Sequence, residues 1–491
     1  MTTPAAFSVT ETDLDRLAST EGKIVVFVDE DGKLDPAARR VSKLTKGALE
    51  RFAGSAAFAK LKAGDVRELA WPAGMAAEGV LVVRLGARDA TDAARKSGVA
   101  IAKASGGRAL TVCMGARREA AAVLLGIVLR GYEYKDQRTK GEDAPDAAGH
   151  VTLMCSKPDQ VAEATADIDA IAQGVFFTRD LVNAPANVLT TREFADRLSA
   201  LAEHGLEVEI LEEDKLAELG MGALLSVGQG SDSPTKVAVL NWRGGGEEAP
   251  FALVGKGVVF DTGGISLKPS SGMEDMTMDM GGGGTVAGVM KTLALRKARA
   301  NVVGLIGLVE NMPSGAATRP GDVVRSMKGD TIEVINTDAE GRMLLADVMW
   351  YAQQRFEPRG MIDLATLTGA AIVALGHENA GIFSTDDTLC GALLTAAGAE
   401  GEGAWRLPLG TGYADQLKSR IADVKNTGGR AAGACTAAEF LHRFVKDDVP
   451  WCHIDIAGMA SVGSETPFAP KGASGWGVRT LDRLVRDTLE G

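Results

Sequence analysis

Cysteine and histidine, which supply many of the zinc ligands in proteins, are scarce in this chain, with five of each among 491 residues. The cysteines never form a C-x-x-C pair, and most lie inside apolar runs, as in the segment 110–114. They predict reduced, buried thiols of a cytosolic protein, and a Cys/His zinc cluster is excluded. The cysteines are Cys113, Cys155, Cys390, Cys435 and Cys452.

The chain also has little that would direct it to a membrane or to nucleic acid. Residues Met1 to Ala5 carry no basic stretch followed by an apolar core, so they predict no signal peptide. No apolar run approaches the length of a membrane span. Lys and Arg number 53 against 65 Asp and Glu, and a net charge of −12 argues against polyanionic partners. We therefore expect a cytoplasmic protein that binds neither membrane nor nucleic acid.

The length of the chain predicts more than one domain. Over residues 1–165, short apolar runs alternate with helical periodicity, which predicts a smaller N-terminal α/β domain. No dense cluster of titratable groups and no G-x-G-x-x-G motif occurs there, so we assign this part no chemistry. The strands expected in it are Lys23–Val28, Val80–Leu85, Ala109–Met114 and Val151–Cys155.

One long helical stretch, from about Gln160 to Leu181, is expected to connect two domains, with 166–182 as the linking helix. Pro185 follows it, and a proline disfavours helix in the residue before it. The rest of the chain, 183–491, predicts the second domain. Before the helix, the charged segment 135–149 with its Gly and Pro predicts a surface loop.

The densest functional chemistry lies in residues 336–342, Asn-Thr-Asp-Ala-Glu-Gly-Arg. The β-branched run 331–335 before them predicts a buried strand, and the apolar spacing over 345–352 after them predicts a helix. The turn would lie at the carboxyl end of a strand, where α/β sheets bind ligands, and Asp338 and Glu340 would point the same way. Acidic residues are also common at helix N-termini, so residues upstream must decide between the two interpretations.

A charged residue, Lys256, interrupts the apolar run Leu253–Phe260, which otherwise predicts a buried strand. Burying an unpaired ammonium is costly. Lys256 is therefore either an edge-strand lysine that faces water or a lysine whose amine is neutralised by a nearby metal ion and binds it. Asp261 ends this strand, and Thr262-Gly263-Gly264 predicts a tight turn beside it that lacks the P-loop pattern.

A further acidic residue, Asp279, stands just before four glycines, Gly281–Gly284, which allow a ligand or a helix to approach the backbone closely. Asp279 would repel phosphate, which argues against a phosphate-binding loop. With Asp261, Asp338 and Glu340 it makes four carboxylates, which suit Mg²⁺, Mn²⁺ or Zn²⁺. Two such ions, held roughly 3.5–4 Å apart, would balance four carboxylate charges.

Several further segments complete this pattern in the second domain. They are 254–257, 260–266, 279–282, 310–315, 319–322, 363–369 and 453–458. Together with the turn 336–342, and in this order, they resemble the leucyl aminopeptidases, also called cytosol aminopeptidases. The resemblance spans about Asn183 to Arg479, and 336–342 is its most specific part. Over the first domain, only the general α/β pattern is similar.

The resemblance implies an α/β fold of two domains, the larger C-terminal one catalytic and built on a central mixed sheet. It implies that Lys256, Asp261, Asp279 and Glu340 bind one divalent ion, and that Asp261, Asp338 and Glu340 bind the other. It places Lys268 and Arg342 at the family's two catalytic positions. It also implies that a side-chain pocket is lined by Met276, Thr366, Leu367 and Gly369.

The activity that the resemblance implies is hydrolysis of the N-terminal residue, Leu-like preferred, from peptides with a free amino terminus. Two metal ions, Mn²⁺ or Zn²⁺ and possibly Mg²⁺, would activate a water molecule. A bicarbonate ion held by Arg342 would serve as general base, which accounts for the absence of histidine from the motifs. The family also implies a homohexamer. The histidines are expected to be structural or surface residues, with His377 as the weakest case: His150, His204, His377, His442 and His453.

Two alternatives differ in class from this hypothesis. One is a catalytically silent relative that acts as a binding or scaffold protein, which the loss of a metal ligand, Lys268 or Arg342 would mark. All seven positions are present here. The other is a metal-dependent phosphoesterase, because acidic two-metal sites also perform that chemistry. The family resemblance argues against it.

Overall fold

The computed structural model describes residues 1–86, 91–139 and 149–490, and it divides into two compact units. The first contains Met1–Phe176 and Glu465–Pro470, and the second contains Phe177–Ser464 and Lys471–Gly491. Most of the loop expected at 135–149 lies outside the described residues. Each unit is described here by itself.

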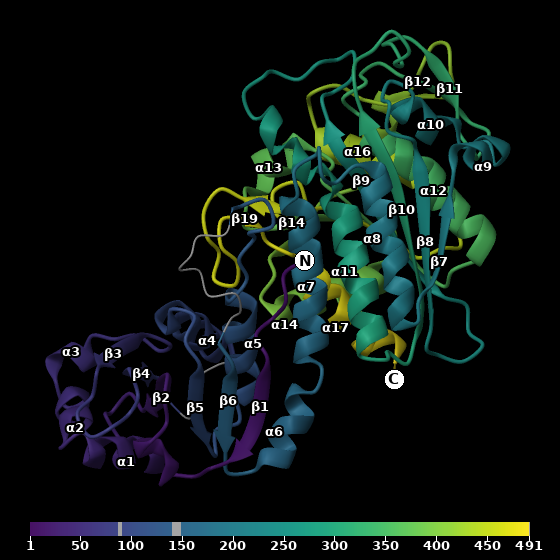
Figure 1. Cartoon of the computed structure of the whole chain (residues 1–491). Helices are drawn as coiled ribbons and strands as arrows, with labels where there is room; N and C mark the ends of the chain where they lie inside the picture. The colour runs from purple at the N-terminus through teal and green to yellow at the C-terminus, as the bar shows by residue number, and fades with distance from the viewer. Residues whose placement is uncertain (87–90, 140–148, 491) are drawn as a thin grey trace. The chain divides into compact units, whose positions relative to one another are not determined.

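The first unit is built on a six-stranded sheet in the order β1-β6-β5-β2-β4-β3 (Figure 1). Neighbouring strands are parallel, except that β3 runs antiparallel to β4 at the sheet edge. The strands are β1 (Phe7–Glu11), β2 (Lys23–Val28), β3 (Val66–Ala70), β4 (Gly79–Arg84), β5 (Leu110–Gly115) and β6 (Val151–Cys155). The helices are α1 (Pro36–Leu44), α2 (Ala48–Ala53), α3 (Ala56–Ala59), α4 (Thr91–Ser105), α5 (Ala120–Arg130) and α6 (Pro158–Thr165).

The four strands expected from apolar runs are confirmed to within one residue as β2, β4, β5 and β6. They are the strands with the most continuous burial, as parallel strands covered on both faces must be. The strands β1 and β3 were not expected. Most of their residues are partly or fully exposed, so they carry a weaker apolar signal.

The prediction of a single helix from Gln160 to Leu181 is wrong, because the structure has two helices there. The helix α6 ends at Thr165, and α7 (Ile168–Asn183) begins three residues later. The hydroxyl of Thr165 donates to the carbonyl of Val161 at 2.8 Å at the end of α6. Asp169 lies in the first turn of α7, where the helix dipole favours an acidic side chain.

The second unit contains an eight-stranded mixed sheet in the order β15-β14-β17-β13-β9-β10-β8-β7. Its central strands β17, β13, β9 and β10 are parallel, and antiparallel strands flank them on both sides. The expected α/β fold with a central mixed sheet is therefore confirmed. The strands are β7 (Glu207–Leu211), β8 (Lys236–Arg243), β9 (Phe251–Asp261), β10 (Asn301–Asn311), β13 (Met361–Ala365), β14 (Ala380–Ser384), β15 (Ala404–Arg406) and β17 (Trp451–Asp455).

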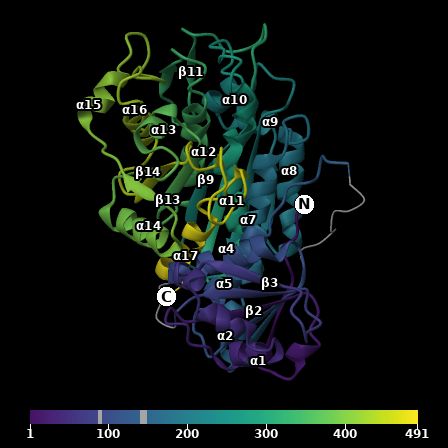
Figure 2. The same cartoon turned by 90° about the vertical axis from the view of Figure 1, so that its left-hand side faces the viewer.

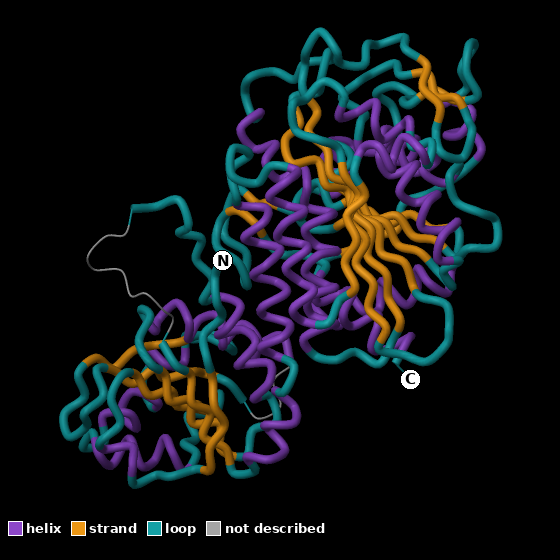
Figure 3. Tube along the Cα trace, turned by 45° about the vertical axis from the view of Figure 1, so that its right-hand side comes forward, coloured by secondary structure: helices purple, strands orange, loops and turns teal. Residues whose placement is uncertain are grey.

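Helices cover both faces of this sheet, as Figures 2 and 3 show. The longer ones are α8 (Thr191–Ser199), α11 (Gly281–Leu295), α12 (Gly341–Phe356), α14 (Asp387–Glu400), α16 (Gly433–His442) and α17 (Val478–Leu489). The shorter ones are α9 (Glu213–Glu218), α10 (Gly222–Gly228), α13 (Gly369–Leu375), α15 (Thr411–Ala414) and the 3₁₀ helix η3 (Met273–Met280). Among the described residues, no helix has both the length and the apolar character needed to cross a bilayer.

Two glycines of β10 identify which helices lie on which face. A side chain at Gly304 would meet residues of α11, whereas one at Gly307 would meet residues of α10 and α12. Residues three apart in a strand point to opposite faces, so α11 covers one face and α10 and α12 cover the other. A large apolar core lies on the α12 face and includes Leu305, Leu344 and Val348.

The strand before the turn 336–342 differs from its expectation. The structure has only β12 (Thr331–Glu333) there, and β12 belongs to a separate sheet with β11 (Val323–Arg325) and β16 (Val424–Lys425). Ile332 and Val334 are buried, but Ile335 is exposed, so the β-branched run is buried on one side only. The turn therefore does not extend from a strand of the central sheet, although it reaches the end of that sheet.

Candidate metal centre

Three carboxylates gather where the parallel strands of the central sheet end. Asp261 is the last residue of β9, and Glu340 is the N-cap residue of α12. One carboxylate oxygen from each of Asp261, Asp338 and Glu340 lies within 4.8 Å of the other two. The structure thus brings together the three residues that the sequence predicts as ligands of one metal ion.

Lys256 lies inside the sheet and not at its edge, so the interpretation as a water-facing lysine is wrong. The strand β9 lies between β13 and β10, and Lys256 is 2% exposed. Its ammonium contacts Asp279 and Glu340, each at 2.8 Å. Gly341 makes this approach possible, because a Cβ atom there would lie 2.7–2.9 Å from the end of the lysine side chain.

Asp279 reaches the same cluster from the end of η3. One of its oxygens accepts from Lys256 and, at 2.9 Å, from the hydroxyl of Thr366. The other oxygen, Oδ2, is buried and has no hydrogen-bond partner among the described residues. The ammonium of Lys256 also donates to the carbonyl of Thr366 at 2.9 Å. Thr366, expected in a substrate pocket, thus contacts two of the expected metal ligands.

Lys268 comes from the loop that follows β9. Its ammonium lies 2.9 Å from Asp261 Oδ2 and also contacts Asp338. The backbone turns back after the strand through Gly263 and Gly264, which both have positive φ, a conformation that favours glycine. This turn brings Lys268 beside Asp261, only seven positions away in the sequence.

The turn 336–342 is held by hydrogen bonds to two distant segments. The hydroxyl of Thr337 donates to the carbonyl of Gly263 at 2.6 Å and accepts from the N–H of Ser266 at 2.8 Å. Asn426 is fully buried, accepts from the backbone N–H of Ile335 at 2.9 Å and donates to the carbonyl of Asn336 at 2.7 Å. These contacts set the direction of Asp338 and Glu340.

The cluster carries more negative than positive charge. Four carboxylates face two ammonium groups, Lys256 and Lys268, so two negative charges are not balanced among these six side chains. Burial raises the pKa of Asp279 well above its ordinary value, against the opposing effect of Lys256. Burial also raises the pKa of Asp338, and Lys268 opposes that rise. Divalent ions would offset these costs, so the oxygen-rich set fits Mn²⁺, Zn²⁺ or Mg²⁺.

The charge state of Lys256 bears on its expected role as a ligand. Burial lowers the pKa of its ammonium, but Asp279, Glu340 and Asp261 outweigh burial and raise that pKa above its ordinary range. Because the carboxylates stabilise the charged ammonium, the amine becomes neutral only if a strong positive charge lies beside it. A divalent ion is such a charge.

Arg342 lies just inside α12 and is 6% exposed. It donates to the carbonyl of Asn426 at 2.9 Å, while its Nε has no hydrogen-bond partner among the described residues. Burial lowers the pKa of Arg342 to about 10, so the guanidinium stays protonated at neutral pH. A buried cation with a free N–H is suited to a small anion.

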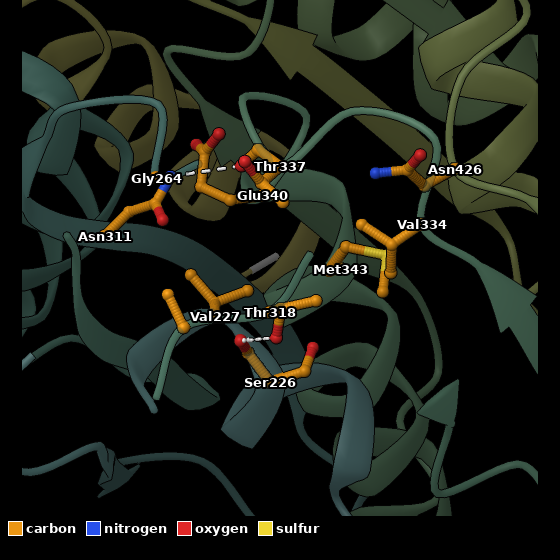
Figure 4. Close-up of a pocket in the computed structure, with 11 residues that line it drawn as sticks. Ser226, Val227, Gly264, Asn311, Thr318, Val334, Thr337, Glu340, Met343 and Asn426 are labelled. Atoms are coloured by element: carbon orange, nitrogen blue, oxygen red, sulfur yellow. Dashed lines mark hydrogen bonds between the residues drawn. The ribbon is translucent and has the colours of Figure 1, made fainter. Parts of the chain in front are cut away.

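A small cavity borders the cluster, and Figure 4 shows the side chains around it. Its volume is about 20 Å³, enough for about one water molecule. Glu340, Asn311, Thr337 and Asn426 contribute polar groups, and the other lining residues are Ser226, Val227, Gly264, Ala317, Thr318, Val334 and Met343. None of the residues expected to line the substrate pocket borders this cavity.

The expected pocket residues come from the 3₁₀ helix η3 and from the loop after β13. Met276 lies half-buried in η3, whereas Leu367 is half-buried and Gly369 exposed after the end of β13. Asp455 holds the loop after β13 by accepting from the N–H of Leu367 at 3.2 Å and from the hydroxyl of Thr368.

Two histidines contact this region without touching the carboxylate cluster. His453 is fully buried, with Nδ1 2.6 Å from Asp363 Oδ1. Nδ1 of His377 lies 2.7 Å from the carbonyl of Gly458. Asn311 and Asn426, in contrast, contact the cluster or its turn but were not predicted from the sequence. Asn311 follows an apolar run and Asn426 follows a mixed polar and apolar segment, and many loops share both contexts.

Comparisons with known proteins place the chain in one family. Residues 176–482 match the catalytic-domain model of the cytosol aminopeptidase family, and residues 25–141 match the model of its N-terminal domain. Two relatives named "Probable cytosol aminopeptidase" align over the full length of both chains. The one from Dinoroseobacter shibae is 62% identical and the one from Cereibacter sphaeroides is 60% identical. The chain belongs to the cytosol aminopeptidase family, a family of hydrolases.

Solved structures of two enzymes share the fold. A mutant of tomato leucine aminopeptidase is 31% identical and has a TM-score of 0.86, with 99% of this chain and 97% of that chain covered. The bottromycin maturation enzyme BotP is 34% identical and has a TM-score of 0.83, with coverages of 96% and 100%. A second BotP structure is in complex with Mn, with a TM-score of 0.82.

Proposed function

We propose that this chain is a metal-dependent aminopeptidase that removes the N-terminal residue, Leu-like preferred, from peptides. The observation that carries the proposal is the gathering of Asp261, Asp338 and Glu340 beside Lys256 and Asp279 in a member of this family. Peptides with a free amino terminus are the proposed substrates.

Two divalent ions are proposed for each chain. Lys256, Asp261, Asp279 and Glu340 would hold one ion, and Asp261, Asp338 and Glu340 would hold the other. When bound, the pair supplies Lewis acidity and lowers the pKa of a water molecule. Mn²⁺ is the first candidate because BotP has been solved in complex with Mn, and Zn²⁺ and Mg²⁺ are the others.

Lys268 and Arg342 are the proposed catalytic side chains. The ammonium of Lys268 lies at the partly open side of the cluster and can donate to the oxygen of a scissile carbonyl as negative charge develops there. Arg342 would hold a bicarbonate ion through its free Nε–H, and bicarbonate would accept the proton of the attacking water.

The proposed specificity comes from Met276, Thr366, Leu367 and Gly369. An apolar pocket formed by them would favour Leu-like and Met-like first residues. The preference over a residue one methylene smaller would be modest, because one methylene contributes only about 1–3 kcal/mol.

A panel of aminoacyl amides tests reaction, specificity and metal together. The chain is first treated with chelator and then supplied with Mn²⁺, Zn²⁺ or Mg²⁺. We expect no hydrolysis after chelation, recovery with at least one ion, and the fastest turnover for leucine amide. The matched control is the N-acetylated form of each substrate, which has no free amine and should stay intact. Equal cleavage of the acetylated form would contradict the proposal.

The silent-relative hypothesis makes the opposite forecast in the same experiment. A binding or scaffold protein would bind metal and peptide but would not turn over any amide with any ion. The presence of both proposed catalytic side chains beside the cluster favours the enzyme.

The remaining expectations belong to the same proposal. They are a homohexamer, a cytoplasmic location, and a division into an N-terminal domain (1–165), a linking helix (166–182) and a catalytic domain (183–491). Light scattering of the purified chain tests the hexamer. Limited proteolysis, followed by mass spectrometry of the fragments, tests the division.

A further inference from the structure

Asn311 links two of the segments that carry the expected metal ligands, although it is not itself an expected ligand. It is the last residue of β10 and is 4% exposed. One N–H of its side-chain amide donates to Asp261 Oδ1 at 2.7 Å, and the other donates to the carbonyl of Thr337 at 3.1 Å. Asn311 thus binds both the end of β9 and the turn 336–342.

A local irregularity in β9, which has one extra residue here relative to β10, brings Asp261 opposite Asn311. Along most of β9 and β10 the paired residues differ by 51 positions, as Val309 and Val258 do, but Asn311 pairs with Asp261. In the unshifted register, Asn311 would lie opposite Phe260 and its side chain would point away from Asp261. Such bulges occur beside active sites, where they redirect a side chain.

The two oxygens of Asp261 have different surroundings as a result. Oδ1 accepts from Asn311 and from the N–H of Gly263 at 2.8 Å, whereas Oδ2 contacts the ammonium of Lys268. Two N–H donors fix the plane of the carboxylate and leave Oδ2 facing the cluster. The backbone carbonyl of Asn311 also accepts from the N–H of Thr262 at 3.0 Å and from its hydroxyl at 2.8 Å.

We propose that Asn311 is a positioning residue of the metal centre, which sets Asp261 and the turn bearing Asp338 and Glu340 at the spacing that divalent ions require. The inference rests on the proposed function, because it assumes that these carboxylates bind metal. Side chains that orient metal ligands typically change metal affinity by 10–100-fold when they are removed.

The chain provides a matched control at the other end of the same strand. Asn301 is the first residue of β10 and is 8% exposed. Its amide donates to the carbonyls of Gly246 and Glu248, both at 2.9 Å. Its side-chain oxygen also accepts from the N–H of Gly245 at 3.0 Å. Asn301→Ala therefore removes a buried asparagine that donates two similar hydrogen bonds, but it leaves the carboxylate cluster untouched.

The experiment is calorimetric titration of the metal-free full chain with Mn²⁺, together with thermal unfolding of the same metal-free samples. We expect Asn311→Ala and the similarly sized Asn311→Leu to bind Mn²⁺ about 10–100-fold more weakly than wild type. Asn301→Ala should bind Mn²⁺ as wild type does, even though its metal-free form unfolds at a lower temperature. With saturating Mn²⁺, the Asn311 variants should regain most of their kcat.

The outcomes separate the inference from the proposed function. Wild-type Mn²⁺ affinity in the Asn311 variants overturns the inference and leaves the aminopeptidase proposal intact. Equal losses of affinity in Asn311→Ala and Asn301→Ala also overturn it, because they would reflect general destabilisation. A wild-type chain that binds no Mn²⁺, Zn²⁺ or Mg²⁺ overturns both proposals. If Asn311→Ala does not fold, Asn311→Ser, too short to keep both contacts, decides by the same titration.

Discussion

Two groups of buried carboxylates in the second unit differ in how completely their oxygens are paired. Asp363, in the middle of β13, is fully buried, with His453 at 2.6 Å from one oxygen and Trp451 donating to the other at 2.7 Å. In the cluster at the end of β9, Asp279 is also buried, yet its Oδ2 has no hydrogen-bond partner among the described residues. Burial alone therefore does not distinguish a structural acid from a binding one.

The difference lies in what each carboxylate lacks. A buried acid whose two oxygens are both hydrogen-bonded to protein groups needs no ligand, and its removal leaves those groups without an acceptor. A cluster with more carboxylates than cations is incomplete, and a divalent ion would complete it. We therefore expect variants of the first group to lose stability and variants of the second to lose metal and activity.

The largest effect is expected for Glu340→Ala, which removes a carboxylate from the incomplete group. Turnover of leucine amide should fall to background and the bound metal per chain should drop, because Glu340 is proposed to contact both ions. Metal analysis and kinetics on the same sample measure both effects. Full activity with wild-type metal content would remove Glu340 from the site.

Next in size is Asp363→Ala, from the paired group. It leaves His453 and Trp451 without their acceptor, and each buried polar group left unsatisfied typically costs about 1–3 kcal/mol. Urea unfolding of the metal-free chain measures this loss, and Mn²⁺ titration of the folded protein should show wild-type affinity. The reverse result, lost metal with unchanged stability, would show that the comparison fails.

Arg342→Ala tests whether chemistry can be separated from metal binding. We expect wild-type metal content and a fall in kcat of about 10²–10⁴-fold, the effect typical of losing general-base catalysis. Added bicarbonate should restore part of the rate, because the proton acceptor itself is not removed. Arg342→Lys keeps the charge without the planar guanidinium, and its kcat should lie between those of wild type and Arg342→Ala. Unchanged kinetics in Arg342→Ala would exclude this residue from the mechanism.

The last effect is a pH dependence of stability, expected from Asp347, a paired acid of α12 that accepts from the N–H groups of Leu224 and Met327. Burial raises its pKa to about 7, and the backbone donors only partly oppose that rise. Because the folded pKa exceeds the unfolded one, the folded state holds a proton that the unfolded state has lost. The free energy of unfolding should therefore fall as the pH rises from about 4 to 7, by at most about 1.4 kcal/mol per pH unit.

The control for this pH dependence is Asp347→Asn, which cannot ionise. Urea unfolding of both proteins at several pH values should show a flatter profile for the variant over the same range. Parallel profiles would show that other groups cause the dependence.

Local sequence patterns were sufficient for the parts of the fold whose signal is local. The continuous apolar runs of β2 and β9 predicted buried strands because strands covered on both faces need apolar side chains at every position. The helix break between α6 and α7 was missed because the helical pattern continues across it. The edge strand β3 was missed because most of its side chains are partly or fully exposed.

The cluster itself was accessible from the sequence because the motif residues are few, close together and chemically unusual. A lysine in an apolar strand and two acids in one turn stand out without any coordinates. Asn311 and Asn426 do not stand out, since asparagine is common in loops and its role here depends on partners 26 to 91 positions away.

The sequence by itself determined the family, the set of chemically competent residues and the class of ion that they suit, because these depend on residue types and their order. Only the tertiary structure decided that Lys256 points at the start of α12 and not at water, and that the turn 336–342 reaches the central sheet from a separate one. It also decided that Asn311 faces Asp261. The physical reason is that a hydrogen bond or an ion pair depends on distances of about 3 Å, and folding alone brings residues far apart in the chain to such distances.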